Sequence, residues 1–161
     1  MAAVRAEILI PRSLHSDIPT YVEFCNRAGE VARAWWLDFN GNPVCYGDIS
    51  PGNHLRMNTY VTHPWVFRNA LNDAKLLVNL EDVYFPEPPV DEDGETVFRQ
   101  VVITSPVYSL KDYCSMLIRK LVKEADFKKL EIAESLKEDL KEAPSLEQEL
   151  RQLNAAHNVK C

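Results

Sequence analysis

Hydrophobic positions along the chain follow two different patterns, and the change falls near residue 106. Before it, short runs of β-branched and aromatic residues alternate with turn residues, which is typical of strands in an antiparallel sandwich. After it, apolar residues recur every three or four positions, as they do along one face of an α-helix. The pattern therefore predicts a mainly β chain, in which a β-sandwich is followed by a small helical part.

Turn residues divide the first part into six or seven short strands. Asn40-Gly41 predicts a type I′ hairpin turn, because both residue types tolerate a positive φ. The sequence Ser-Pro-Gly-Asn at residues 50–53 marks a second turn. The acidic, proline-bearing stretch 87–95 is expected to be a solvated loop. The predicted strands include residues 31–39, 55–61, 65–68, 75–80, 83–85 and 97–104.

Three helical segments are predicted after residue 106. Ser109, with Asp112 three residues later, indicates a capping box at the start of the first. A break at residues 124–126 separates the first from the second, and Pro144-Ser145 ends the second and begins the third. The apolar positions of the three segments are Leu110, Cys114, Leu117, Ile118 and Leu121, then Phe127, Leu130, Ala133, Leu136 and Leu140, and finally Leu146, Leu150 and Leu153. The expected domains are residues 11–106, 107–143 and 144–158.

Composition and charge narrow the classes of partner. The 161 residues are 46% hydrophobic, which fits a globular chain with its own core, and the net charge is −6. All of this charge arises in residues 1–106, where 14 acidic side chains oppose 8 basic ones, so nucleic acid is not an expected partner. No apolar run reaches the 18 residues of a membrane span, and the first residues lack the apolar core of a signal peptide, so no membrane partner is expected.

The polar and sulfur-containing residues show no familiar catalytic or metal-binding spacing. Cys25, Cys45, Cys114 and Cys161 form no C-x-x-C pair, which argues against a zinc site and a disulfide framework and favours a reducing compartment, the cytoplasm and nucleus. No phosphate-binding, metalloprotease or nucleophile-elbow motif occurs. The chain is therefore expected not to be an enzyme and to need no cofactor or metal. A catalytic triad assembled only by the fold is the remaining enzyme hypothesis.

Two features suggest binding instead. An aromatic cluster with interleaved hydroxyl and imidazole groups fits either a sandwich core or a pocket for a small apolar ligand that carries one polar group. The apolar stripe of the helical part, which has under 40 residues, is too small to be stable alone and must pack on the sandwich or on another protein. The cluster consists of Trp35, Trp36, Tyr46, Thr59, Tyr60, His63 and Trp65.

At these residues the chain resembles the von Hippel-Lindau tumour suppressor family. The segments FCNR (24–27), WLDFNGNP (36–43), HPWVFRNA (63–70) and LLVN (76–79) are similar to those of its β domain. The segments PVYSLKDYCSMLIRKLVK (106–123) and FKKLEIAESLKEDL (127–140) are similar to those of its α domain. The resemblance implies a β-sandwich, a three-helix α domain and a last helix that packs back on the sandwich.

The resemblance also implies a function. Members of the family are substrate-recognition subunits of a cullin-RING ubiquitin ligase, not enzymes. They bind elongin C and, with it, elongin B and a cullin of the cullin-2 type with its RING protein. Their β domain binds 4-hydroxyproline in hypoxia-inducible factor α. A scaffold of the same fold that binds unmodified peptides is the alternative.

The implied site residues follow from the matching positions. Trp36, Tyr46 and Trp65 would enclose the proline ring, and Thr59 and His63 would hydrogen-bond its hydroxyl. The neighbouring peptide groove would be lined by Phe24, Met57, Asn58 and Tyr60, and elongin C would be contacted by Leu110, Cys114, Ile118, Leu130, Ile132 and Leu136. The chain departs from the family pattern at Gly47, Asn58, Thr59 and Tyr113, where proline, histidine, serine and arginine are usual.

Overall fold

The computed structural model describes residues 11–158, so Cys161 and the N-terminal segment considered above lie outside the described residues. Strands come first and helices follow, as the hydrophobic pattern predicts. The strands are β1 (Pro19–Asn26), β2 (Ala32–Leu37), β3 (Pro43–Ile49), β4 (His54–Tyr60), β5 (Trp65–Asn69), β6 (Lys75–Val78), β7 (Val90–Glu92), β8 (Glu95–Val97) and β9 (Arg99–Thr104). The helices are α1 (Leu110–Leu121), the 3₁₀ helix η1 (Glu124–Lys129), α2 (Glu134–Lys141) and α3 (Leu146–Asn158).

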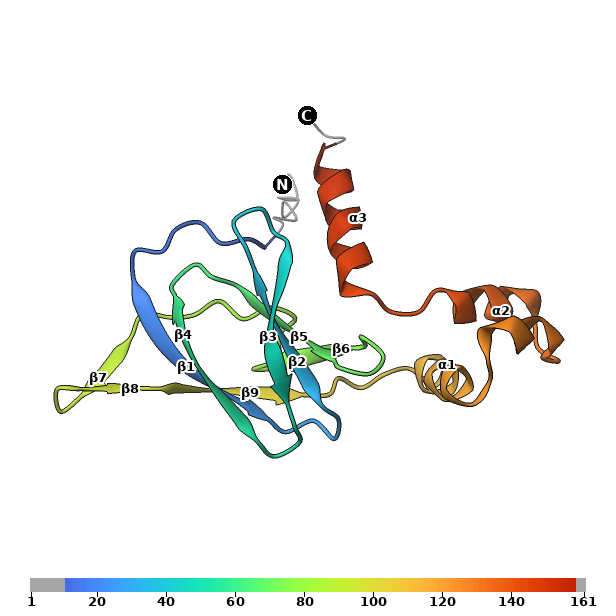
Figure 1. Ribbon diagram of the computed structural model, residues 1–161, viewed down its shortest axis with the longest axis horizontal. Helices are drawn as coiled ribbons and strands as arrows, with labels where there is room; N and C mark the ends of the chain where they lie inside the picture. The colour runs from blue at the N-terminus through green and yellow to red at the C-terminus, as the bar shows by residue number, and fades with distance from the viewer. Residues whose placement is uncertain (1–10, 159–161) are drawn as a thin grey trace, which may run out of the picture.

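Seven strands form a sheet in the order β3-β2-β5-β6-β9-β1-β4, and this sheet folds over into a sandwich (Figure 1). The short strand β6 joins the two halves, because it pairs with β5 on one side and with β9 on the other. The β-sandwich prediction is confirmed, but its pairing is not wholly antiparallel. Strands β1 and β9 run parallel, which the long connection between them permits.

The aromatic ring of Phe24 lies at the centre of the core between the two halves of the sandwich. Its centroid is 4.9 Å from that of Phe67, 5.2 Å from that of Trp65 and 6.1 Å from that of Tyr84. Phe24 itself is fully buried. Ala32 and Ala34 are buried in the same cluster, and their small side chains let the two halves of the sandwich pack closely around the ring.

Several local expectations differ from the structure. The stretch 87–95 is not only a loop, because it contains most of the β7–β8 hairpin, whose turn residues Asp93 and Gly94 both have positive φ. Residues 83–85 form no strand, and Tyr84 makes only an isolated bridge to Trp65.

The turn at Asn40-Gly41 is not type I′, because only Gly41 has a positive φ (79°). The Asp38 carboxylate accepts the backbone N–H groups of Asn40 and Asn42, which stabilises a longer loop instead.

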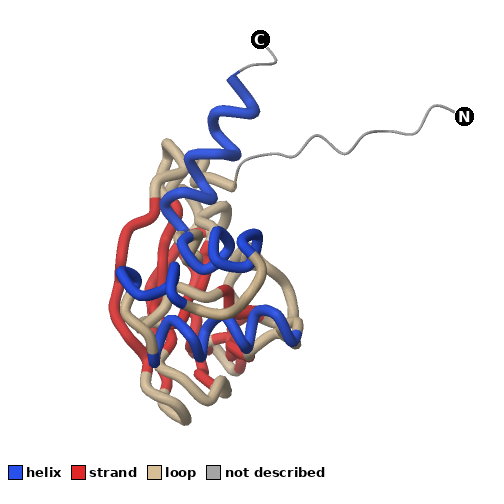
Figure 2. Tube along the Cα trace, turned by 90° about the vertical axis from the view of Figure 1, so that its right-hand side faces the viewer, coloured by secondary structure: helices blue, strands red, loops and turns tan. Residues whose placement is uncertain are grey.

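Helices α1 and α2 with η1 form a small α domain beside the sandwich (Figures 1 and 2). The capping box is confirmed, since the side chains of Ser109 and Asp112 each accept the backbone N–H of the other. The predicted continuous second helix is wrong over residues 127–133, because the chain there forms η1 and a bend before α2 begins at Glu134. Arg119 joins α1 to α2, donating hydrogen bonds to the carbonyl oxygens of Asp139, Leu140 and Glu142 at the end of α2. Over residues 11–158, no helix is both long and apolar enough to cross a membrane.

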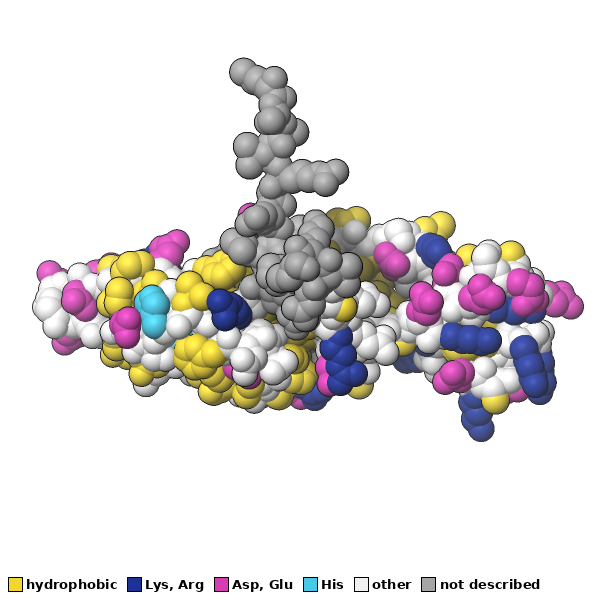
Figure 3. Space-filling view, turned by 90° about the horizontal axis from the view of Figure 1, so that it is seen from above, with side chains coloured by type: hydrophobic (Ala, Val, Ile, Leu, Met, Phe, Trp, Pro, Cys, Tyr) yellow, Lys and Arg dark blue, Asp and Glu magenta, His cyan; other side chains and the backbone are white. Residues whose placement is uncertain are grey.

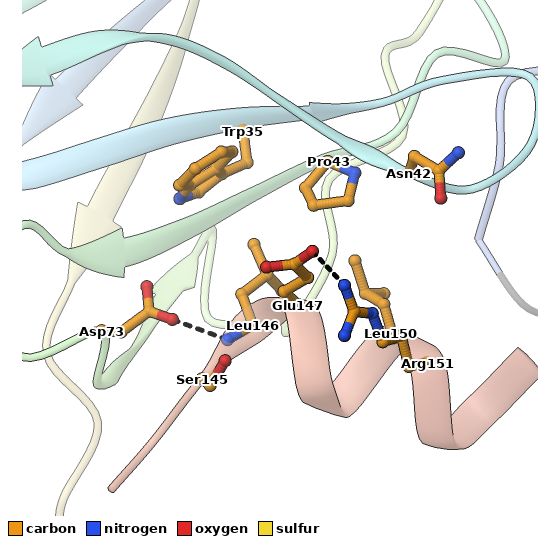
Figure 4. Close-up of a pocket in the computed structure, with 9 residues that line it drawn as sticks. All are labelled: Trp35, Asn42, Pro43, Asp73, Ser145, Leu146, Glu147, Leu150 and Arg151. Atoms are coloured by element: carbon orange, nitrogen blue, oxygen red, sulfur yellow. Dashed lines mark hydrogen bonds and ion pairs between the residues drawn. The ribbon is translucent and has the colours of Figure 1, made fainter.

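Helix α3 returns to the outer face of the sandwich, as the resemblance implies. Its buried Leu146 and Leu150 pack with Leu37 and Val66. Figure 4 shows Trp35 and Pro43 facing the start of α3 across a cavity of about 460 Å³, with the Asp73 carboxylate accepting the backbone N–H of Leu146 (2.6 Å). A second link joins the Arg68 guanidinium, which is 5% exposed, to the Glu149 carboxylate of α3 at 2.9 Å.

Truncation of this apolar contact is expected to weaken the docking of α3. Leu150→Ala removes a leucine that is 6% exposed and should lower the free energy of unfolding by about 2–4 kcal/mol. Arg151→Ala on the next position is the control, because its ion pair with Glu147 is exposed and should contribute under about 0.5 kcal/mol. Denaturant unfolding, together with hydrogen exchange of the α3 amides, measures both. Equal losses for the two variants would contradict this account of the docking.

Candidate functional site

A pocket of about 250 Å³ opens at one end of the sandwich, where strands β2, β3, β4 and β5 bring their ends together. The loop after β2 and the segment before β1 complete its rim. Its members lie far apart in the sequence. Strand pairing joins β2 to β3 and to β5, and the folding of the sheet brings β4, at its other edge, to the same pocket. The lining residues are Ser16, Trp36, Phe39, Tyr46, Asn58, Thr59, Tyr60, His63 and Trp65.

Aromatic rings form the walls of this pocket. The rings of Trp36 and His63 are stacked, with centroids 5.2 Å apart and planes 21° apart. Tyr46 closes the opposite side, its centroid 5.2 Å from that of Trp65 and 6.1 Å from that of Trp36. Tyr46 is 46% exposed, whereas Trp65 is 2% exposed, so the pocket is open to solvent beside Tyr46 and buried at its inner end beside Trp65. Such a cage suits a small apolar ring.

A β-bulge places Tyr46 in this wall. The register between β2 and β3 shifts between Ala34 and Trp35, so that Ala34 pairs with Gly47 and Trp35 pairs with Cys45. Tyr46 is the extra residue of the bulge, and Gly47 beside it has a φ of 127°, which other residues rarely adopt. Gly47 is therefore part of how this chain directs Tyr46 into the pocket wall.

The buried inner end of the pocket carries the hydroxyl group of Thr59. Thr59 is 4% exposed, and its Oγ1 accepts the indole N–H of Trp65 at 3.1 Å. Because a hydroxyl both donates and accepts, Thr59 Oγ1 keeps its own proton as a donor. Thr59 thus fixes the Trp65 ring and still presents one polar group to a ligand.

His63 provides a second polar group, and its surroundings decide which nitrogen is the acceptor. The backbone carbonyl oxygen of His15 lies 3.1 Å from His63 Nε2, and the hydroxyl of Ser16 lies 3.1 Å from the same nitrogen. A carbonyl can only accept, so Nε2 carries the proton and Nδ1 is the acceptor in the neutral ring. Burial lowers the pKa of His63, so the ring is neutral at pH 7.

The two polar groups of this pocket offer different hydrogen-bonding roles, Thr59 as a donor and His63 Nδ1 as an acceptor. A ligand hydroxyl can accept from the Thr59 hydroxyl and donate to His63 Nδ1, which a carbonyl or an ammonium group cannot do. The cage around them matches an apolar ring of a few carbon atoms. Over residues 11–158, no group of three or more His, Cys, Asp and Glu side chains is placed to hold a metal ion.

The structure gathers most of the expected site residues in one pocket and contradicts one expected residue of the peptide groove, Phe24. Trp36, Tyr46, Thr59, His63 and Trp65 line one pocket with Asn58 and Tyr60. Phe24 cannot line a peptide groove, because it is fully buried in the core. Met57 is half-buried and packs partly against that core, and its place in the neighbouring peptide groove stays a prediction.

Three residues near the pocket are absent from the sequence-based set. Phe39 and Ser16 line it from loops, which the strand pattern could not reveal. Ser13 is buried behind it, where its hydroxyl accepts the Trp36 indole N–H at 2.8 Å and donates to the Leu37 carbonyl at 2.6 Å. Trp35, in contrast, belongs to the opposite face of β2, which packs against α3.

A second candidate site is the outer face of α1, on which no residue is buried. Leu110 is 80% exposed and Leu121 is 72% exposed, although both are apolar. Cys114 is exposed as well, and Ile118, Leu130 and Ile132 are half-buried, while Leu136 on α2 is 40% exposed. Charged side chains of both signs gather on the rest of this end of the molecule (Figure 3). An apolar stripe on an otherwise charged helix pair fits the groove of a partner protein.

The fold and these two sites define a β-sandwich binding domain joined to a small helical domain with an unpartnered apolar face. The chain matches the family model of the VHL beta domain over residues 11–92 and that of the VHL box domain over residues 108–156. It therefore belongs to the VHL family. The pocket lies in the first matched range and the α1 face in the second.

One relative is the Drosophila melanogaster protein named Protein Vhl. The two are 24% identical over 110 residues, which cover 64% of this chain and 62% of the relative. The match thus spans somewhat under two thirds of the length of that relative.

Proposed function

We propose that this chain is the substrate-recognition adaptor of a cullin-RING ubiquitin ligase and binds 4-hydroxyproline in hypoxia-inducible factor α. The observation that carries the proposal is that one aromatic cage holds both a donor, the Thr59 hydroxyl, and an acceptor, Nδ1 of His63. A pyrrolidine ring fits the cage, and its 4-hydroxyl supplies the group that both polar side chains need. Binding would direct the substrate to ubiquitination and degradation in the oxygen response.

The position of the pocket supports a peptide as the ligand. Strand β4 is an edge of the sheet, so its outer backbone groups are open to a further strand. Asn58, Thr59 and Tyr60 of β4 line the pocket directly. An extended peptide lying along β4 would therefore place one side chain in the cage while its backbone pairs with the edge.

The α1 face supports the partner side of the proposal. Elongin C would cover Leu110, Cys114 and Ile118, whose spacings of four residues align them on one helix face. Elongin B and a cullin of the cullin-2 type with its RING protein would join through elongin C. The complex would act in the cytoplasm and nucleus, with no nucleic-acid or membrane partner and no cofactor.

A capture experiment tests the proposal as a whole. Two immobilised peptides that differ only in the proline hydroxyl are incubated with lysate containing the chain, and the bound fraction is scored for the chain, the elongins and the cullin. The hydroxylated peptide should retain all of them and the unmodified peptide almost none. Equal capture by both peptides would identify a scaffold that binds unmodified sequences instead.

The pH dependence of binding follows from the state of His63. Protonation removes the Nδ1 acceptor, and burial lowers the pKa of His63 below its ordinary value of 6.5. Affinity for the hydroxylated peptide should therefore change little from pH 8 to pH 7 and fall only once the pH drops below the ordinary histidine value. Calorimetry at several pH values measures this, with the exposed His54→Ala variant as the control that keeps the profile. A decline centred above pH 7 would contradict the assigned role of His63.

A further inference from the structure

Thr62 has a strained backbone next to the pocket. Its φ is 81°, in the left-handed region, where a β-branched side chain is a genuine outlier. Among the described residues, the other non-glycine positions with positive φ are Asp73, Asn79, Leu80 and Asp93, and none of them is β-branched. Strain of this kind persists where the surroundings hold the residue in place, and it collects at functional sites.

The side chain of Thr62 holds the segment that crosses the pocket rim, residues 13–16, which we call the strap. Thr62 Oγ1 donates to the carbonyl oxygen of His15 at 3.1 Å. The same oxygen is 3.3 Å from the backbone nitrogens of Leu14 and His15, whose N–H groups it accepts. One hydroxyl thus binds two consecutive strap residues, which lie 47 and 48 positions away in the sequence.

The strap in turn orients both stacked rings of the pocket wall. At one end, the Ser13 hydroxyl accepts the indole N–H of Trp36. At the other end, the His15 carbonyl and the Ser16 hydroxyl meet Nε2 of His63. The His15 carbonyl therefore accepts from both Thr62 and His63, so the threonine fixes the very group that assigns the histidine tautomer.

We propose that Thr62 is a positioning residue for hydroxyl recognition. Its backbone is strained, its hydroxyl holds the strap in place, and the strap in turn holds His63 with Nδ1 as the acceptor. This inference rests on the proposed function, because it assigns Thr62 a role in hydroxyproline selectivity. A merely structural role would instead make Thr62 important for the shape of the turn alone. The two roles differ in what happens when strain and hydroxyl are removed separately.

Three variants of the full chain separate these effects. Thr62→Val keeps the β-branched shape and the strain but loses the hydroxyl, and Thr62→Ser keeps the hydroxyl. Thr62→Gly relieves the strain and also loses the hydroxyl. The matched control is Leu80→Gly, which relieves strain at a different position of positive φ (65°), an exposed residue in the turn after β6 whose side chain makes no hydrogen bond.

Two readouts are needed, and the first requires no ligand. Imidazole ¹⁵N NMR of the free chain reports the tautomer of His63, and calorimetry reports the ratio of affinities for hydroxylated and unmodified peptides. Thr62→Val and Thr62→Gly should mix the tautomers and lower the affinity ratio by about 2- to 12-fold, as expected for one hydrogen bond. Thr62→Ser should restore both signals. Thr62→Gly should melt at or above the temperature of Thr62→Val, and Leu80→Gly should leave tautomer and ratio unchanged.

The outcomes separate this inference from the function on which it rests. If the wild-type chain prefers the hydroxylated peptide but Thr62→Val keeps both the ratio and the single tautomer, the clamp is wrong and the proposed function stands. If the wild-type chain binds both peptides alike, the proposed function and the selectivity role fall together. In that case the tautomer signal still decides whether Thr62 positions His63.

Discussion

The chain is expected to bind a hydroxylated peptide of hypoxia-inducible factor α at least about 100-fold more tightly than the unmodified peptide. An aromatic cage alone would discriminate weakly, because apolar walls barely reject or reward one added hydroxyl. Thr59 and His63 are 4% and 7% exposed, and the discrimination comes from the hydroxyl proton of Thr59 and the Nδ1 of His63, which stay desolvated and without a partner when the ligand hydroxyl is missing. Two such groups at about 1–3 kcal/mol each correspond to roughly 30-fold to over 10⁴-fold.

Variants of the pocket distinguish its polar end from its walls. His63→Ala and Thr59→Val should shrink the ratio mainly by weakening the hydroxylated peptide, whereas Trp65→Ala should weaken both peptides. Thr59→Ser keeps the acceptor for the Trp65 indole N–H and serves as the matched control that preserves the ratio. Fluorescence anisotropy on the two peptides measures all four variants. A wild-type ratio near one would leave only a general peptide-binding module.

Leu110→Asp is expected to abolish binding of elongin C. Leu110 is 80% exposed in the isolated chain, and in a partner's groove the new carboxylate would be desolvated without a counter-charge, at a cost of several kcal/mol. The helix itself should tolerate the change, because Leu110 is its first residue and an acidic side chain there is favourable. Loss of binding would therefore report the interface and not the unfolding of α1.

Stability measurements complete this test. Elongin C with elongin B should raise the melting temperature of the wild-type chain by mass action and leave that of Leu110→Asp unchanged. Leu80→Asp is the control, since it charges a leucine that is 75% exposed but lies in the turn after β6 and not in the helical part. A stable chain that ignores elongin C would refute the interface, as would equal binding by Leu110→Asp.

Local signals in the sequence predicted the helical part and the turns better than the pairing of strands. The Ser109–Asp112 capping box and the apolar face of α1 involve residues three to eight positions apart, so a short stretch of sequence is enough to predict them. The second helix was predicted too long, because the helical spacing of apolar residues already begins at Phe127 in η1, although the backbone becomes α-helical only at Glu134. The Asp93-Gly94 turn carried a hairpin signal that its acidic surroundings obscured.

The class of fold, the residue types of the cage and the family could all be predicted from the sequence, because these depend on composition, alternation and motif. Three features became visible only in the folded chain: Phe24 belongs to the core, Phe39 and Ser16 line the pocket, and Nδ1 of His63 is the acceptor. These features depend on contacts between loops and strands tens of residues apart, such as the 48 positions between His15 and His63. No local propensity encodes such a contact, since it exists only once the sheet has brought the segments together.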